Sequence, residues 1–561
     1  MRWSDPSLSF SRAIRWLVAL WGETVVPVQV SEVVAGRETY LQRTTGGAER
    51  QERRDGVLLG HVDVPSSDEL LPTIARGAIV LDTQARRAAV VEQAEALATR
   101  AGGRVDVAAE ASLVDQITNL VEEPHGVLGD FDERYLDLPA QILTTVMRKH
   151  QRYLPVLDAS GDLLPHFVTM ANGLCDDATV KAGNESVIRA RYEDALFFWN
   201  ADLQTDSVES FVPGLDQLTF EDRLGSVGQR ARRIADVAGA LADQVRLSAA
   251  DRETLTRAGA LAKYDLATQM VTEMTSLAGF VAREYAVRTG EPQAVADALY
   301  ETEQPKTSAD ALPASVPGAL LALGDRFDLL MAMFAIGAKP TGSSDPFGLR
   351  RAALGVVRIL RDQGVVGQAL ADLSIRSGLE AAAVRLRSQG VEVSDESVDA
   401  ALEFTVGRYA QLLRDEGTSV HLIDAVLPGA ATPGEATTAL AQAEALRGDE
   451  GFRSIVASLQ RIGRIVPEGT ATAYDASRLT EPAEVELREA LEGLPEGSSA
   501  DLETFATQGK ALVDPVARFF DDILVMAEDP EVRAARLGLL ASVRAAAPRQ
   551  VDWSALSTAL A

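Results

Sequence analysis

The first group of residues that could bind a ligand is a basic run, Met147-Arg-Lys-His-Gln-Arg-Tyr153, which ends in an aromatic residue. Cations interleaved with an aromatic suit RNA, which proteins contact through phosphates and by stacking on bases. We therefore predict that Arg148, Lys149 and Arg152 contact RNA. The alternative for any single basic heptamer is an ordinary exposed helix end.

A second group of cations lies on an expected helix with Asp345 as its N-cap and Pro346 at its first position. Arg351 and Arg358 are seven residues apart, so they project from one helix face about two turns apart. Together with Arg350 they are predicted to meet phosphates, because the planar guanidinium group suits bidentate phosphate contacts. The alternative is a solvated face, or ion pairs with the many acids of the chain.

A third group consists of Tyr264-Asp265 and Asp325, which lies 60 residues after Asp265. Phosphohydrolases of the HD superfamily hold divalent metals with a His, an adjacent His-Asp pair and a distant Asp on a helical scaffold. Here tyrosine replaces the paired histidine, and no histidine occurs between His166 and His421. Tyrosine, with an ordinary pKa near 10, is a poor substitute for imidazole. We expect Asp265 and Asp325 to face each other across a helical pair and to hold no metal.

Composition narrows the function classes. The 561 residues include 54 basic and 82 acidic side chains, a net charge of −28, so any nucleic-acid contact must use a local basic patch. The one cysteine, Cys175, excludes an intramolecular disulfide framework and a cysteine-built zinc site. No phosphate-binding P-loop, H-E-x-x-H or G-x-S-x-G motif occurs, and no apolar run is long enough to span a bilayer. We predict an intracellular protein without a membrane or DNA partner.

The secondary structure that we expect around these residues changes along the chain. The segment 1–205 reads as an α+β region. A β-branched stretch occurs at 25–30, a helix is expected over 83–100, and a hairpin is expected from Tyr153–Leu157 and Leu163–Met170. The hairpin turn contains Gly161, which tolerates a positive φ.

Beyond residue 210 the pattern becomes mainly helical. Apolar residues recur at helical spacing over 229–245, and Ser248 to Asp251 forms a capping-box signature for the next helix. We predict three helical parts: a domain over 215–345, a helical body over 346–436, and a bundle over 437–550 that follows a Pro- and Gly-rich stretch.

The last helical part carries two arginine pairs. Arg461 and Arg464, like Arg533 and Arg536, are three residues apart, so each pair shares a helix face and can approach adjacent phosphates. The alternative is that these arginines are surface charges that only keep the chain soluble.

Seven short motifs occur in order along the chain. They are Met1-Arg-Trp3 with Phe10, Gly22 and Val26-Pro27; Met147 to Pro155; Gly183-Asn-Glu185 with Val187-Ile-Arg189-Ala-Arg191 and Asp194 to Phe198; Phe220-Glu221 with Leu224-Gly225; Ala262 to Met270; Asp345 to Leu354; and Phe519 to Met526. In this order they resemble the beta subunit family of bacterial heterotetrameric glycyl-tRNA synthetase.

The resemblance implies a division of labour. In this family the alpha subunit makes glycyl-adenylate from glycine and ATP with Mg²⁺, and the beta subunit recognises tRNA(Gly) within an alpha2beta2 complex. The resemblance also implies a degenerate HD-type domain in the middle of the chain, containing Tyr264, Asp265 and Asp325, and a DALR-type anticodon-binding bundle at its end. We therefore expect a cytoplasmic protein with no catalytic residue and no cofactor of its own.

Two departures from the family pattern matter. Family members carry a further region before the Met-Arg-Trp motif, so we expect a fragment, an alternative start or part of a fused gene. The family's Gly-His-Arg-Phe motif reads Gly60-His61-Val62-Asp63 here, so no function is transferred to that position.

Two other functions remain as alternatives: an HD-type metal-dependent phosphohydrolase, and a helical interaction scaffold without a substrate. Phosphatase activity with Mn²⁺ or Mg²⁺ would favour the first. RNA binding without any dependence on salt would favour the second, because phosphate contacts release counterions.

Overall fold

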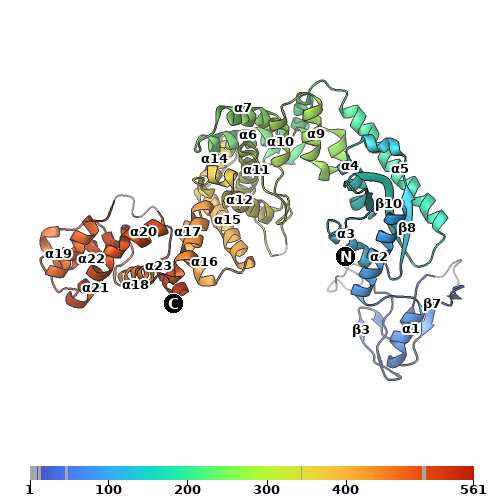
Figure 1. The fold of residues 1–561 in the computed structure, drawn as a ribbon, viewed down its shortest axis with the longest axis horizontal. Helices are drawn as coiled ribbons and strands as arrows, with labels where there is room; N and C mark the ends of the chain where they lie inside the picture. The colour runs from blue at the N-terminus through green and yellow to red at the C-terminus, as the bar shows by residue number, and fades with distance from the viewer. Residues whose placement is uncertain (1–8, 10–13, 44–48, 343, 496–500) are drawn as a thin grey trace. The chain divides into compact units, whose positions relative to one another are not determined.

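The protein is described by a computed structural model that covers residue 9 and residues 14–43, 49–342, 344–495 and 501–561. The chain folds into two compact units, one ending at Asp202 and the other beginning at Leu203 (Figure 1). None of the helices in the described ranges combines the length and apolar character that a membrane span requires.

The first unit begins with short antiparallel strands. Two hairpins, β1 (Leu20–Trp21) with β2 (Thr24–Val25) and β3 (Gln29–Val30) with β4 (Val33–Val34), precede a small sheet. That sheet has the order β5 (Glu38–Tyr40), β7 (Leu58–Asp63), β6 (Arg50–Glu52). The β-branched stretch 25–30 is thus shared by two hairpins and is not one strand. Pro27, which has no N–H to donate, lies at the break.

A second sheet forms the core of this unit. Its order is β8 (Pro124–Asp130), β10 (Leu163–Asn172), β9 (Leu154–Leu157), all antiparallel. The predicted hairpin is confirmed: Leu157 pairs with Leu163, and Gly161 in the turn has φ +95°. The helices α2 (Thr83–Arg100) and α3 (Ala111–Leu120) share one apolar core with the sheet. Helix α2 has the predicted bounds, because the Asp82 carboxylate accepts from the Ala85 N–H at its start.

The predicted basic run lies among the other helices of this unit. The short α1 (Leu70–Arg76) lies beside the first strands, and α4 (Ala140–Thr145) continues directly into a turn of π-helix, η3 (Val146–Gln151). The long helix α5 (Asp177–Asp202) packs against β8 and contacts η3. Its buried Tyr192 donates a hydrogen bond to the Leu143 carbonyl of α4 (3.3 Å), which anchors α5 beside the basic run.

The second unit is helical, as predicted. The short strands β11 (Thr219–Glu221) and β12 (Gly225–Ser226) are its only strands among the described residues. Helix α11 (Val316–Ala335) is buried along nearly its whole length and packs against α6 (Val227–Ala242), α7 (Ala249–Ala260) and α10 (Gln293–Glu301). The Ser248 hydroxyl accepts from the Asp251 N–H at the start of α7, so the N-cap part of the predicted capping box is confirmed. The remaining helices up to residue 415 are α8 (Gln269–Glu273), α9 (Phe280–Arg288), α12 (Leu349–Leu360), α13 (Val365–Ala369), α14 (Ile375–Ser388) and α15 (Asp395–Asp415).

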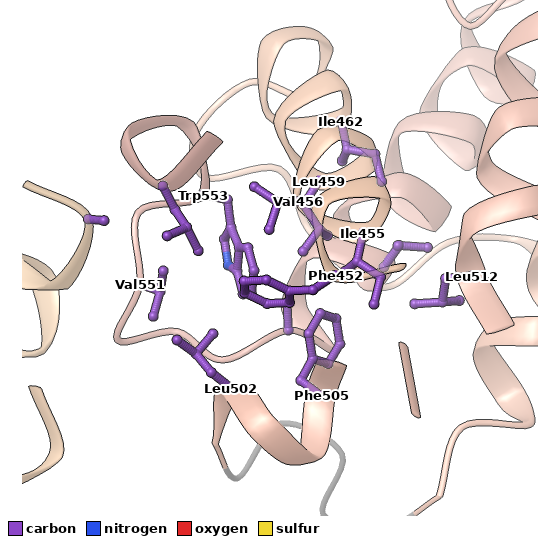
Figure 2. Close-up of a cluster of buried hydrophobic side chains, with 14 of the residues drawn as sticks. Phe452, Ile455, Val456, Leu459, Ile462, Leu502, Phe505, Leu512, Val551 and Trp553 are labelled. Carbon is purple, nitrogen blue, oxygen red and sulfur yellow. The ribbon is translucent and has the colours of Figure 1, made fainter. Parts of the chain in front are cut away.

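The C-terminal helices share one continuous apolar core. Phe452 on α18 (Glu450–Ile465), Phe505 on α20 (Leu502–Gln508) and Trp553 on α23 (Trp553–Leu560) meet at its centre (Figure 2). The core also receives side chains from before residue 437 and after residue 550, for example Leu422 and Leu556. The other helices of this part are α16 (Val420–Val426), α17 (Pro433–Ala445), α19 (Pro482–Glu492), α21 (Val513–Asp522) and α22 (Pro530–Ala545).

Candidate nucleic-acid interface

The basic run of the first unit exposes two cations, Lys149 and Arg152, together with His150. It forms the π-helical turn η3, and Arg152 after it adopts a left-handed conformation (φ +58°). Lys149, His150 and Arg152 are exposed, whereas Arg148 binds the buried Glu110 carboxylate (Nε to Oε1, 2.7 Å). Of the three predicted RNA-contact residues here, Arg148 is therefore held by an acid, and Lys149 and Arg152 face solvent.

Helix α5 adds cations to the same surface. Arg191 is exposed and makes no ion pair among the described residues. The pKa of His150 is lowered, first by partial burial and then by the positive charges of Arg191, Arg152 and Lys149. Lys149, Arg152 and Arg191 therefore form one positive surface around His150, and we call these four residues the basic-turn patch. It can attract the phosphates of a nucleic acid.

Sequence reasoning overlooked Arg191 as a contact residue, although it stands in a motif that carried the family resemblance. Helix α5 also exposes apolar side chains, Val187 and the 65% exposed Phe197, and a further cation, Arg189. An exposed aromatic ring is a surface on which an unpaired base can stack. A signal was present in the sequence: two arginines, Arg189 and Arg191, precede the Phe197-Phe198 pair by a few residues.

The arginines after Asp345 are less free than their spacing suggested. Arg358 donates to the carbonyls of Thr307 (3.0 Å) and Asp310 (2.8 Å), and Arg350 donates to the Gly342 carbonyl (2.7 Å). Both therefore hold loops in place. Arg351 is exposed and has no hydrogen bond or ion pair among the residues that the structure describes. That these three arginines contact phosphates stays a prediction, and Arg351 is the member best placed for it.

The start of this helix corrects the expected cap. Helix α12 begins at Leu349, not at Pro346, and its N-cap is Gly348 with φ +68°. The Asp345 carboxylate nevertheless accepts hydrogen bonds from the N–H groups of Leu349 (2.8 Å) and Arg350 (2.9 Å). It therefore satisfies the first helix amides from outside the helix.

The predicted pair on α18 differs from the pair on α22. Arg461 lies 4.4 Å from the centre of the Phe520 ring and 3.8 Å from Asp521, whereas Arg464 is exposed and unpaired within the described chain. On α22, Arg536 binds the fully buried Glu484 carboxylate at 2.5 Å, and Arg533 donates to the Ala527 carbonyl (3.2 Å). The α22 pair therefore holds the bundle together.

The residues of the expected HD relic lie in a buried network of charges. Tyr264 and Asp265 form a 3-10 turn, η5 (Tyr264–Ala267), and Asp325 lies on α11. The Lys263 ammonium lies 2.5 Å from Glu303 and 3.2 Å from Asp325. Arg230 on α6 completes the network at 2.7 Å from Asp325.

Asp265 and Asp325 have different partners. The Asp265 carboxylate accepts from the Gly279 N–H (2.7 Å), and its burial raises its pKa to about 6. Burial alone would also raise the pKa of Asp325, but the charges of Lys263 and Arg230 lower it to about 2.

This arrangement does not fit a divalent metal, because Lys263 and Arg230 occupy the Asp325 carboxylate and the Gly279 amide binds that of Asp265. Tyr264 donates its hydroxyl hydrogen to the Ala282 carbonyl (2.7 Å), and burial raises the pKa of that hydroxyl. Its oxygen is therefore held as a neutral donor and not as a metal ligand.

Potential metal ligands also gather elsewhere in the described part of the first unit. One set consists of His125, Cys175 and Asp177, and the other consists of Glu38, His61 and Asp63. In the first set His125 Nε2 lies 2.7 Å from Asp177 Oδ1, and burial together with nearby aspartates raises the pKa of the Cys175 thiol. Each set contains an exposed carboxylate, and neither includes the relic residues.

Comparison with known proteins gives one family. The family model described as glycyl-tRNA synthetase beta subunit matches residues 1–428. Among curated proteins, the glycine–tRNA ligase beta subunit of Desulforamulus reducens is 35% identical over 99% of the chain and 78% of its own length, and that of Persephonella marina is 32% identical over 100% and 79%. The chloroplastic/mitochondrial glycine–tRNA ligase 2 of Arabidopsis thaliana is 34% identical over 99% of the chain, which spans 50% of the plant protein.

Proposed function

Because the chain belongs to the glycyl-tRNA synthetase beta subunit family, we propose that it is the tRNA-binding beta subunit of a glycine–tRNA ligase. In this role it binds tRNA(Gly), and a separate alpha subunit attaches glycine with ATP and Mg²⁺ in an alpha2beta2 complex. The chain alone forms no glycyl-adenylate. We expect it to act in the cytoplasm.

The family match carries this proposal, and the basic-turn patch supports it. Within a chain of net charge −28, Lys149, Arg152 and Arg191 are cations that no acidic side chain neutralises among the described residues. Such a local patch attracts RNA phosphates, while the acidic remainder repels RNA that approaches in other orientations. The C-terminal bundle, which we assign to the anticodon region of the tRNA, supplies Arg464 as an exposed cation.

The test uses the chain together with its alpha subunit. Replacing Lys149, Arg152 and Arg191 by Gln should weaken tRNA(Gly) binding. It should also flatten the slope of log affinity against log salt by about two units, because each lost phosphate contact removes roughly 0.7 to 0.9. A matched control replaces three exposed arginines of the same unit, Arg50, Arg54 and Arg100, which have no ion pair among the described residues.

Two outcomes would separate the parts of the proposal. Equal loss in both triple variants would mean that net charge matters and the patch does not. Failure of the complex of wild-type chain and alpha subunit to bind tRNA(Gly) in preference to other tRNAs would refute the function itself.

The phosphohydrolase alternative has no support from the geometry. Lys263 and Arg230 neutralise the carboxylate of Asp325, and Asp265 is bound to a backbone amide. A metal hydrolase needs its carboxylates available for the ion and a water molecule.

A further inference from the structure

A hollow of about 310 Å³ lies in the C-terminal bundle, between the loop after α18 and the end of α22. Its floor is apolar and buried, and it includes Pro548, Val551 and Trp553. Its rim is polar and includes Thr470, Arg544 and Arg549. An apolar floor with a few polar groups at the edge is typical of a small-ligand site.

The walls of the hollow are held in place before any ligand arrives. The Ser542 hydroxyl on α22 donates to the Thr472 carbonyl (2.9 Å) and Arg544 donates to the Val466 carbonyl (3.4 Å), so the loop is tied to the helix. On the other side, the Trp553 ring packs against Phe505 in the core, with ring centres 5.5 Å apart (Figure 2). A preformed site loses little conformational entropy on binding.

The charge at the rim is not neutralised. Arg544 and Arg549 make no ion pair with an acid in the described part of the chain, whereas Arg478, Arg518 and Arg536 of the same bundle do. The nearest acid in sequence, Asp552, accepts hydrogen bonds from the Ser554 and Ala555 amides at the start of α23. Two guanidinium groups without an acidic partner in the described chain therefore line one hollow.

We infer that this hollow binds one unpaired nucleotide of an RNA. The base lies against the apolar floor that contains Trp553, and the phosphate lies between Arg544 and Arg549, whose guanidinium groups suit bidentate phosphate contacts. The hydroxyl oxygen of Thr470 can accept a hydrogen bond from a ribose 2′-hydroxyl or a base edge. The inference rests on the proposed role in tRNA binding and names a subsite for it.

The experiment is photo-crosslinking of 4-thiouridine-substituted tRNA(Gly), and of a short single-stranded RNA, to the complex with the alpha subunit. We expect a crosslink on the tryptic peptide that contains Trp553. In the double variant R544Q/R549Q the crosslink and the RNA affinity should fall at least about fivefold, since loss of the one phosphate contact that the two arginines share weakens binding by roughly that factor or more. Because Arg549 is exposed, R549Q alone should show part of the loss if the double variant does not fold.

The matched control R414Q/R447Q removes two exposed arginines that have no ion pair among the described residues of the same unit, and it should leave the crosslink unchanged.

Free nucleoside monophosphate at millimolar concentration should leave most of the RNA crosslink in place. Complete displacement of the RNA at micromolar concentration would mark a site for a soluble nucleotide and overturn the inference. If tRNA binds but never crosslinks here, the subsite is wrong while the function stands. If no RNA binds at all, both fall.

Discussion

Replacing Lys263 by Met tests whether cationic side chains stabilise the buried acids of the helical unit. The Lys263 side chain is only 9% exposed, and its ammonium group pairs with Glu303 and Asp325. Removing it leaves the half-buried Glu303 without this cation, while Asp325 keeps Arg230. Tyr264, which follows directly, is held by its own hydrogen bond to Ala282 and should not move.

The size of the effect follows from the burial and the charges. Removing one partner of a buried ion pair costs about 3–5 kcal/mol, because the other charge is left without compensation. The lowered pKa of Asp325, about 2 against an ordinary 3.8, corresponds to a net stabilisation of about 2 kcal/mol, which remains after Lys263 and Arg230 have offset the cost of burial. We therefore expect K263M to lower the free energy of local unfolding by about 3 kcal/mol at pH 8.

The pH dependence gives the effect a signature. In the wild-type protein the pKa of Asp325 lies below its unfolded value, so its contribution is present above about pH 4 and is lost as the pH falls toward 2. In K263M the carboxyl groups of Glu303 and Asp325 should have higher pKa values than before. The loss of stability should then shrink between pH 8 and pH 5, as Glu303 takes up a proton.

The assay is hydrogen exchange of the α11 amides (Val316–Ala335) with increasing urea, because a chain of several domains does not unfold in one step. The matched control is K510M. Lys510 is half exposed and lies 3.4 Å from Asp449, so its loss should cost less than about 1 kcal/mol. Equal effects of K263M and K510M at pH 8, or a K263M effect that does not change with pH, would refute the reasoning.

Two further predictions concern buried acids. Because burial raises the pKa of Asp265 to about 6, its ionisation lowers the stability of the fold by about 3 kcal/mol as the pH rises from 4 to 6. D265N, whose amide oxygen can still accept from Gly279, should therefore unfold at a higher temperature than wild type at pH 8 and not at pH 4. Identical shifts at both pH values would contradict this. R536Q should lower the free energy of unfolding of the C-terminal bundle by about 3–5 kcal/mol, measured by hydrogen exchange of α22, since Glu484 is fully buried. R464Q, at an exposed position, should lower it by less than about 0.5 kcal/mol. A similar loss for both would show that the Arg536 pair is not structural.

Local signals in the sequence predicted the elements well. Helix α2 has the predicted bounds because Asp82 caps it, and the hairpin of β9 and β10 forms around Gly161 with its positive φ. Ser248 starts α7 as its spacing to Asp251 indicated. These features depend on hydrogen bonds within a few residues, so the sequence alone contains them. Where a local rule was wrong, as at Asp345, the left-handed Gly348 delayed the helix by three residues.

The partners of the cations were decided by the tertiary structure. Helical spacing correctly placed Arg351 and Arg358 on one helix and Arg533 and Arg536 on another, but it says nothing about what faces them. Arg358 binds carbonyls about 50 residues earlier in the chain, and Arg536 binds Glu484, 52 residues earlier.

The sequence by itself determined the family, the helical character after the first unit, and the absence of histidine around Asp265 and Asp325. Only the fold decided that Lys263 and Arg230 neutralise Asp325, and that Arg191 joins Lys149 and Arg152 on one surface. The physical reason is the distance along the sequence between the residues that interact. Helix caps and turns are satisfied by neighbours in the chain, whereas the free or paired state of a charge depends on residues that folding brings together from far apart.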